Sequence, residues 1–143
     1  MEIACQKWEC KALKLHDRRF NIDFMVYRVK NGFGVVSHED RKNPIRNPIC
    51  GFYCEVRCRN NYFLKYPTMI LAEKKWVELK KFSMPTAPSV FLVSWTDCIG
   101  YVKYDENLKV RREWGGRNDM RDSEDVEPLI HIPREYFKIM HHY

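Results

Sequence analysis

The sequence predicts a mixed α/β (α+β) fold in which helices flank a central mixed β-sheet, and three observations carry this prediction. Residues 49–59 alternate apolar and polar side chains with the period of two that a half-buried strand requires. Residues 68–82 repeat apolar side chains at helical spacing, and residues 89–95 form a short apolar run typical of a buried strand. The chain has 143 residues, so we expect one domain over residues 1–143.

The first third of the chain predicts a helix followed by two strands. Residues 2–15 carry apolar residues that can share one face of a helix. Residues 22–29 are rich in β-branched and aromatic side chains, which favours a strand. An Asn-Gly pair at 31–32 indicates a turn, and a short strand is expected at residues 33–36. Residues 37–48 contain prolines, asparagines and basic residues, and an irregular basic loop is expected there.

The strand at 49–59 separates a cysteine-rich face from a charged one. One face carries Cys50, Phe52, Cys54, Val56 and Cys58, and the other carries Gly51, Tyr53, Glu55, Arg57 and Arg59. The strand therefore places Glu55, Arg57 and Arg59 side by side on a polar face. The three cysteines would spread along about 27 Å of strand. That is too far for one zinc ion, whose bonds to sulfur are about 2.3 Å long.

The next predicted helix begins at Thr68, a residue type that favours the N-cap position, and ends near Phe82. Its apolar face consists of Met69, Ala72, Trp76 and Leu79. The apolar strand at 89–95 follows. A turn at Thr96-Asp97 then leads to a further strand over residues 98–104.

The chain beyond residue 104 changes in composition. Residues 105–127 are rich in acidic residues and contain a Gly-Gly pair, so a long surface loop is expected. A helix is expected from Pro133, a residue type suited to the first helical position, to Met140. Residues 105–143 are interpreted as a C-terminal extension of the same domain.

Charge and cysteine content indicate the setting and the partners. Lysine and arginine total 25 against 19 acidic residues, and the net charge of +6 favours polyanionic partners such as nucleic acid. There are six cysteines, but the N-terminus does not resemble a secretion signal. We therefore expect reduced thiols without a disulfide framework, and a cytoplasmic location. No apolar run approaches the roughly 20 residues of a membrane helix.

Two acidic residues occupy neighbouring predicted strands, and a lysine-containing helix follows them. Asp23 lies in Asn21-Ile22-Asp23-Phe24, and Glu55 lies in Cys54-Glu55-Val56-Arg57-Cys58-Arg59. Lys65-Tyr66-Pro67-Thr68 then leads into the helix with Lys74-Lys75-Trp76, and the strand and turn Phe91-Leu92-Val93-Ser94-Trp95-Thr96-Asp97 follow. Over residues 20–104 this order resembles the PD-(D/E)XK nuclease superfamily. It is similar to a small subgroup common in bacteriophages, as are the tail segments 115–119, 127–128 and 131–133.

The resemblance implies a restriction-endonuclease-like core and a metal-dependent attack of water on DNA phosphodiester bonds. It assigns Asp23 and Glu55 as ligands of Mg²⁺ or Mn²⁺, hard ions that prefer carboxylate oxygens. The sequence departs from the family at Arg57, where the family has lysine. Arginine stays protonated and cannot act as a general base, although it can orient water or bind phosphate.

A lysine from the following helix can replace the missing one, a relocation known in this superfamily. At about 100° per residue, Lys75 lies at the border of the apolar helix face and Lys74 points well away. Lys75 is therefore the better candidate for a fourth catalytic residue beside Asp23, Glu55 and Arg57. Taken singly, Glu55 and Arg57 also fit an ion pair on a sheet, and Lys75 fits a solvated helix lysine.

Basic residues and interleaved aromatic residues in or beside the polar strand face predict contacts with nucleic acid. The candidates are Arg41, Lys42, Arg46, Arg59, Lys65 and Tyr66. A solvated loop packed on the core is the alternative interpretation of the same residues.

Three functional hypotheses follow. The first is a phage-type nuclease that acts on DNA in the cytoplasm of the host cell. The second is a nucleic-acid-binding module that keeps the scaffold but has lost catalysis through Arg57. The third is a phage protein that binds a host protein through the acidic 105–127 extension. The oligomeric state is left open, and a homodimer is compatible with each hypothesis.

Overall fold

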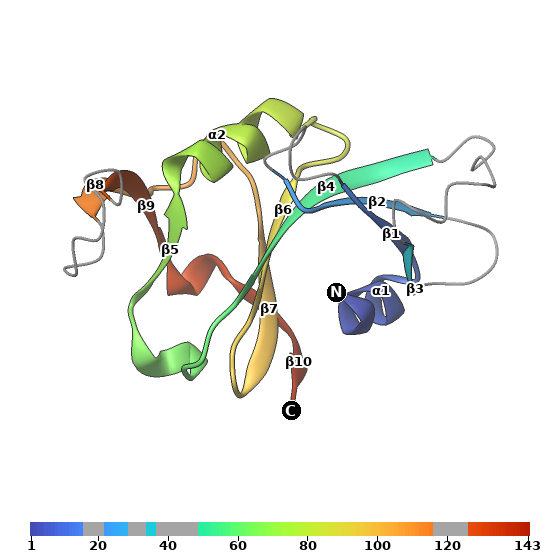
Figure 1. Ribbon diagram of the computed structural model, residues 1–143, viewed down its shortest axis with the longest axis horizontal. Helices are drawn as coiled ribbons and strands as arrows, with labels where there is room; N and C mark the ends of the chain where they lie inside the picture. Colours follow the sequence, from blue (N-terminus) through green and yellow to red (C-terminus); the bar gives the residue numbers. More distant parts are fainter. Residues whose placement is uncertain (16–21, 29–33, 37–48, 116–125) are drawn as a thin grey trace.

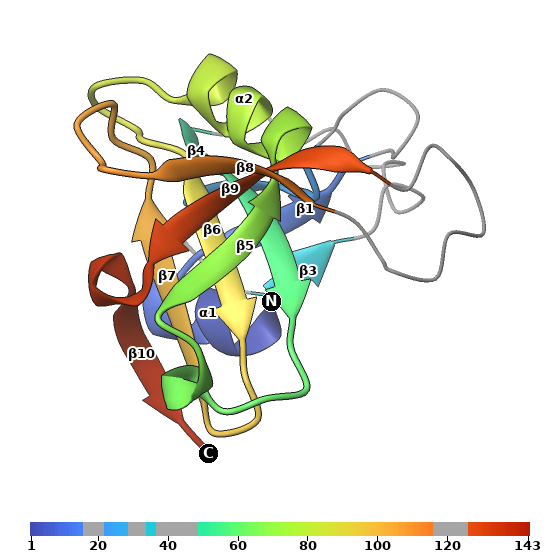
Figure 2. The same cartoon turned by 90° about the vertical axis from the view of Figure 1, so that its left-hand side faces the viewer.

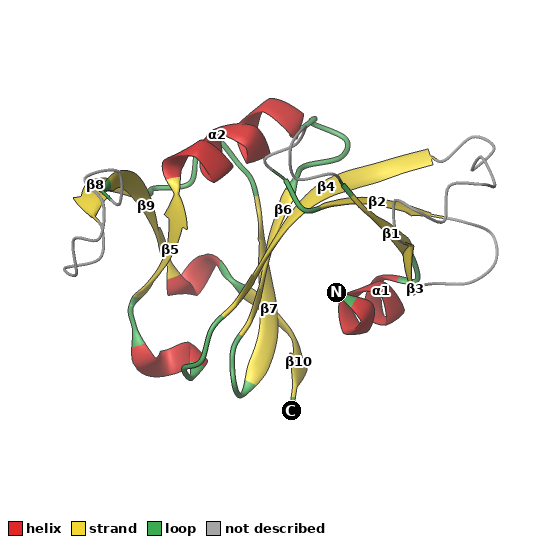
Figure 3. Cartoon of the chain, in the orientation of Figure 1, coloured by secondary structure: helices red, strands yellow, loops and turns green. Residues whose placement is uncertain are grey.

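The structure of the protein, a computed structural model, describes residues 1–15, 22–28, 34–36, 49–115 and 126–143. In these residues, two α-helices, two short 3₁₀ helices and two β-sheets form a mixed α/β arrangement (Figures 1 and 3). The predicted mixed α/β class is therefore confirmed.

The larger sheet has seven strands in the described residues, in the order β10-β7-β6-β4-β2-β1-β3. Their bounds are β1 Lys11–Lys14, β2 Phe24–Arg28, β3 Gly34–Val36, β4 Ile49–Cys58, β6 Val90–Ser94, β7 Cys98–Lys103 and β10 Lys138–His142. The β1–β3 and β4–β6 pairs are parallel, and the other pairs are antiparallel. The strands predicted at 22–29, 33–36, 49–59, 89–95 and 98–104 are confirmed.

The two faces of the larger sheet pack against different elements. Helix α1 (Glu2–Trp8) covers one face, where Ala4 and Cys5 join Val90 and Leu92 of β6 in one buried cluster. Helix α2 (Glu73–Phe82) covers the other face, where Leu79 joins the second cluster. Figure 3 shows the two helices on opposite sides of the sheet. Successive side chains of β6 point to opposite faces of the sheet, so Val90 and Leu92 pack on the α1 side and Phe91 and Val93 on the α2 side.

A smaller sheet lies over the α2 side of the larger sheet. It has three antiparallel strands in the described residues, in the order β5-β9-β8, with bounds β5 Thr68–Ala72, β8 Arg111–Gly115 and β9 Glu127–Pro133. Figure 2 shows β5 and β9 crossing in front of β6. Leu71 of β5 and Ile132 of β9 are fully buried in the same cluster as Phe91 and Val93 of β6. The two sheets therefore share one hydrophobic core.

The helix predicted from Thr68 begins later than expected. Residues 68–72 form β5, so Thr68 is not the N-cap, and α2 runs from Glu73 to the expected end at Phe82. Met69 and Leu71 are buried while Ile70 between them is exposed, which is the alternation of a strand. Pairing with β9 stabilises this strand and overrides the local helical pattern.

The helix predicted over residues 2–15 is also shorter than expected. Glu9, with φ 49° and ψ 50°, adopts the left-handed conformation that commonly ends a helix. Strand β1 then begins at Lys11 and lies between β2 and β3, and its residues Ala12 and Leu13 are buried.

Two predictions for the C-terminal part of the chain are wrong, because strands occur where the sequence predicts a loop at 105–127 and a helix at 133–140. The described parts of the first region include β8 and the start of β9. The second region is a 3₁₀ helix at Arg134–Tyr136 followed by β10, which pairs with β7. Gly100 of β7 permits this approach, since a Cβ there would lie only 2.9 Å from the Ile139 side chain. Strand pairing thus overrides the favourable helix start at Pro133.

None of the described cysteines, Cys5, Cys10, Cys54, Cys58 and Cys98, forms a disulfide. In the described part of the chain, no helix has the length and apolar character needed to cross a membrane.

Candidate active site

The site forms where β2 begins and β4 continues beyond it. The antiparallel register pairs Phe24 with Cys54, so Asp23, just before β2, lies opposite Glu55. Residues directly opposite each other in an antiparallel pair point to the same face of the sheet. The two predicted acidic residues therefore come from adjacent chain segments and share the face that α2 covers.

Asp23 also completes the backbone hydrogen bonding at this point. Because β2 does not extend past Phe24, β4 has no β2 residue to pair with Val56. The Val56 N–H instead donates a hydrogen bond of 2.8 Å to Asp23 Oδ2. Asp23 is held in turn by its own carbonyl, which accepts a 2.8 Å bond from the Leu15 N–H. These bonds fix the carboxylate beside Glu55.

Glu55 is fully buried between two cations. Lys75 Nζ of α2 lies 3.1 Å from Glu55 Oε2, and Arg57 Nη2 of β4 lies 3.1 Å from Glu55 Oε1. The lysine contact is a hydrogen bond, whereas no described residue donates a hydrogen bond to Oε1. The Lys75 side chain is 16% exposed and the Arg57 side chain 41%, so Arg57 forms the solvent-facing side of the cluster.

The electrostatic environment of Glu55 favours its protonated form. The pKa of the Glu55 carboxyl is raised to about 7, first by burial and second by the nearby charge of Asp23. Lys75 and Arg57 act in the opposite direction, because their positive charges favour the carboxylate. The acid thus titrates near neutral pH, which is common at functional sites.

The structure brings all four predicted catalytic residues, Asp23, Glu55, Arg57 and Lys75, into one cluster. Lys74 lies apart from it, with a side chain that is 64% exposed and pairs with Glu127. Among the described residues, no group of three or more His, Cys, Asp or Glu side chains is placed to bind one metal ion. Asp23 and Glu55 are the two carboxylates of this cluster that can hold a cation.

The predicted nucleic-acid contacts are placed only in part. Arg41, Lys42 and Arg46 lie outside the described residues. Arg59 continues the charged face of β4, and its Nη2 donates a 3.0 Å bond to the Ile70 carbonyl. Lys65 and Tyr66 lie in the exposed segment before β5, with Lys65 Nζ 5.2 Å from the Tyr66 ring centre.

The sequence interpretation missed residues that the C-terminal strands bring to this side. His131 of β9 and Arg134 of the following 3₁₀ helix line a pocket together with Arg59 and Tyr66. Alternation of buried Ile130 and Ile132 with the less buried His131 is the strand signal that could have placed them.

Comparison with known proteins identifies the family of the chain. A family model described as "Phage putative PDDEXK endonuclease" matches residues 2–140. No curated protein and no solved structure matches the chain. The family match covers nearly the whole sequence, including Asp23, Glu55, Arg57 and Lys75. The chain therefore belongs to the phage PDDEXK endonuclease family.

Proposed function

We propose that this protein is a metal-dependent nuclease that hydrolyses DNA phosphodiester bonds, with Asp23 and Glu55 holding Mg²⁺ or Mn²⁺. The observation that carries the proposal is the pair of carboxylates that share one sheet face where β2 meets β4. Membership of an endonuclease family supports it. In this proposal β2, β4, β6, β7 and α2 correspond to the restriction-endonuclease-like core.

The residues of the cluster fit a hard divalent cation. Such ions prefer oxygen ligands, and carboxylates are their usual protein partners. Glu55 Oε1 is buried and accepts no hydrogen bond from any described residue, and Asp23 uses only Oδ2 for such a bond. A cation between the two acids would offset the desolvation and repulsion that raise the Glu55 pKa. When bound, the ion supplies Lewis-acid charge at the phosphate.

Lys75 and Arg57 have different proposed roles. A lysine can give up a proton, whereas arginine remains protonated, so Lys75 is the residue suited to orient the attacking water and move its proton. Arg57 lies on the solvent side, where its guanidinium can bind two oxygens of a phosphate. For a cation to reach Glu55 Oε1, Arg57 must leave that oxygen. The Arg57 side chain is 41% exposed, so it can move away from Glu55 into solvent.

Cleavage assays with Mn²⁺ test this function on single-stranded, duplex and branched DNA. We expect wild-type protein to cut at least one of these substrates. Glu55→Gln, which keeps the shape but removes a metal ligand, should lower the rate by about 100-fold or more. Glu106→Ala, at an exposed acid after β7, is the matched control and should cut as wild type does. Absence of cleavage by the wild type, or full activity of Glu55→Gln, contradicts the proposal.

A DNA-binding module without catalysis is the second candidate. Arg57 at the family's lysine position favours it, as do the two cations that already face the Glu55 oxygens. In that case DNA affinity falls steeply with salt concentration, and Glu55→Gln neither cuts DNA nor binds it differently from wild type.

A further inference from the structure

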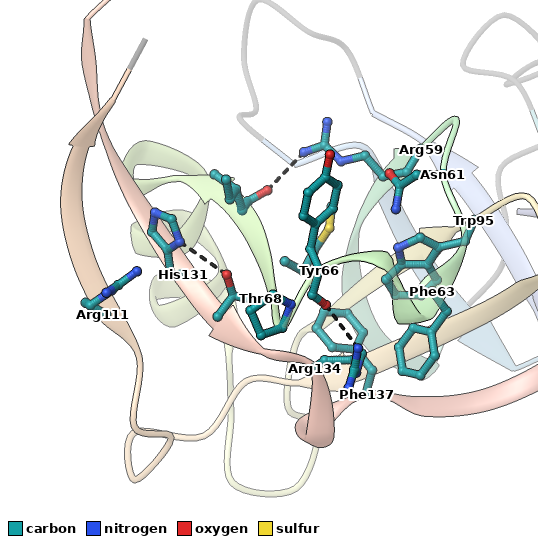
Figure 4. A pocket seen from close by; sticks show the side chains of 13 residues that line it. Arg59, Asn61, Phe63, Tyr66, Thr68, Trp95, Arg111, His131, Arg134 and Phe137 are labelled. Carbon is teal, nitrogen blue, oxygen red and sulfur yellow. Dashed lines mark hydrogen bonds between the residues drawn. The ribbon is translucent and has the colours of Figure 1, made fainter.

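The pocket lined by Arg59, Tyr66, His131 and Arg134 lies beyond the active site along the same strand. It has a volume of about 610 Å³, in the range of small-molecule sites. Figure 4 shows its walls, which come from the end of β4, the segment before β5, β9 and the 3₁₀ helix after it. The residues that matter here are Arg59, Tyr66, Trp95, His131 and Arg134.

The cavity offers positive charge from the basic side chains that line it. Within the described residues, no carboxylate pairs with Arg59 or Arg134, whereas Arg111 and His131 both approach Glu113. Among the described residues, the Arg59 side chain donates one N–H to the Ile70 carbonyl, which leaves most of its five donors for another acceptor. Burial and then the charge of Arg57 lower the pKa of Arg59. An anion placed beside Arg59 would offset both effects.

Aromatic side chains form the apolar part of the same cavity. Tyr66 is 53% exposed, and Trp95, which contacts Phe63 edge-on at 4.9 Å, is buried in the wall. Arg134 Nη1 donates bonds of 2.9 Å and 3.3 Å to the Leu64 and Tyr66 carbonyls, so it holds the segment that carries the tyrosine. An exposed aromatic ring beside an unneutralised arginine suits a group with both a planar base and a phosphate.

The cavity lies in line with the active site. Glu55, Arg57 and Arg59 share one face of the same extended segment, and Arg59 hydrogen bonds to Ser94 in continuation of the β4–β6 pairing. Four residues of strand separate Arg59 from Glu55 by about 13 Å. A nucleic-acid strand that places one phosphate at Glu55 can therefore place a nucleotide a short way along the same strand in the cavity.

We propose that this cavity is a subsite for one unpaired nucleotide of the DNA substrate, with its base on Tyr66 and its phosphate at Arg59. The inference rests on the proposed nuclease function and names its substrate class, DNA with a single-stranded segment beside the scissile bond. A base inside a duplex is stacked on both faces, so it cannot stack on Tyr66 without leaving the helix.

Binding measured without metal tests the subsite separately from catalysis. Fluorescence anisotropy would follow labelled single-stranded DNA and a duplex of the same sequence, in EDTA. We expect wild type to prefer the single strand, and Tyr66→Ala to weaken single-strand binding by about tenfold while duplex binding is unchanged. Tyr66→Phe keeps the ring and should bind as wild type does. Tyr62→Ala removes a 66% exposed tyrosine that does not line the cavity and is the matched control.

The outcomes separate the two proposals. Equal affinity for single strand and duplex, or equal losses in Tyr66→Ala and Tyr62→Ala, overturns the subsite even if Glu55-dependent cleavage is found. Tyr66-dependent preference for single strands in a protein that cuts no DNA supports the subsite and contradicts the nuclease function. Circular dichroism of each variant verifies the fold.

Discussion

Among single residues, Glu55 has the most unusual environment. It is a fully buried acid with Lys75 at one oxygen, Arg57 at the other and the charge of Asp23 nearby. Removing a carboxylate from water has an unfavourable desolvation energy, and the attraction of the two cations offsets part of it. The net effect is a pKa of about 7 for the Glu55 carboxyl, well above its ordinary value of 4.5.

This raised pKa predicts how the stability of the metal-free protein depends on pH. The folded state keeps the Glu55 proton up to about pH 7, whereas the unfolded chain releases it near 4.5, so the contribution is fully present below 4.5. Stability should therefore fall by roughly 3 kcal/mol as the pH rises through this window. Urea unfolding at several pH values measures it.

Glu55→Gln is the control for this titration, because glutamine has a similar shape and no proton to lose. The variant should lack the part of the pH dependence that lies between 4.5 and about 7. Parallel pH profiles of the two proteins would show that Glu55 titrates normally, and the environment described for it would be wrong.

Lys75 and Lys74 provide a matched pair on one helix. Lys75→Ala removes the cation at Glu55 Oε2 and should lower DNA cleavage by about 100-fold, the usual range for a residue that handles a proton. Lys74→Ala removes an exposed ion pair with Glu127 and should leave the rate within about twofold of wild type. Single-turnover cleavage rates measure both, and equal rates would exclude a role for Lys75.

Of these residues, the sequence could predict Glu55 and Arg57 as neighbours, because a period of two in one strand is a local property. Lys75 could be preferred over Lys74 from helical geometry alone. The complete burial of Glu55 could not be predicted, because it depends on α2 packing over β4.

At the scale of elements, α2 decides where Lys75 lies. Leu79 on its inner face is 1% exposed within the core, and its carbonyl accepts a hydrogen bond from the buried Ser89 hydroxyl. The first turn of α2 also contacts the smaller sheet. Arg112 of β8 donates hydrogen bonds of 2.6 Å and 3.1 Å to the two carboxylate oxygens of Glu73. Packing and these charge contacts together hold the helix over β4.

Leu79→Ala should therefore lower the free energy of unfolding by about 2–5 kcal/mol, the usual cost of a buried leucine. Val77→Ala, at a position 51% exposed on the same helix, should change it by less than about 0.5 kcal/mol. Chemical denaturation of the three proteins provides the comparison. A loss for Leu79→Ala as small as that for Val77→Ala would mean that α2 is not anchored through this core.

The elements predicted correctly are those with strong local patterns, such as β4 and β6. The sequence predicts a helix where β5 lies, because Met69 and Ala72 also fit helical spacing, and its pairing with β9 is what makes this segment a strand. Strands β9 and β10 were missed for the same reason. Their partners lie far away in the sequence, and local propensity contains no information about them.

At the scale of the whole molecule, one core joins the two sheets. Buried residues of β5, α2, β6, β9 and the segment before β10 belong to the same cluster: Leu71, Leu79, Phe91, Ile132 and Phe137. A sheet that shares its core with another cannot lose its packing independently. One domain over residues 1–143 stays a prediction, and the shared core is the observation that favours it.

The described protein should accordingly unfold in a single transition. Tryptophan fluorescence reports on all four tryptophans, among them Trp95 in the core between the sheets and Trp8, the last residue of α1. Far-ultraviolet circular dichroism follows the strands and helices. Coincident urea curves from the two methods are expected. Two separated transitions would show that the smaller sheet and the C-terminal strands form an independent unit.

Crystals soaked in Mn²⁺ above pH 7, where Glu55 is ionised, test the central claim most directly by anomalous diffraction. We predict a peak between the carboxylates of Asp23 and Glu55, with Arg57 displaced from Glu55 Oε1. A protein that binds Mn²⁺ elsewhere, or that keeps Glu55 paired with Lys75 and Arg57 without an anomalous peak, would contradict the proposed metal site.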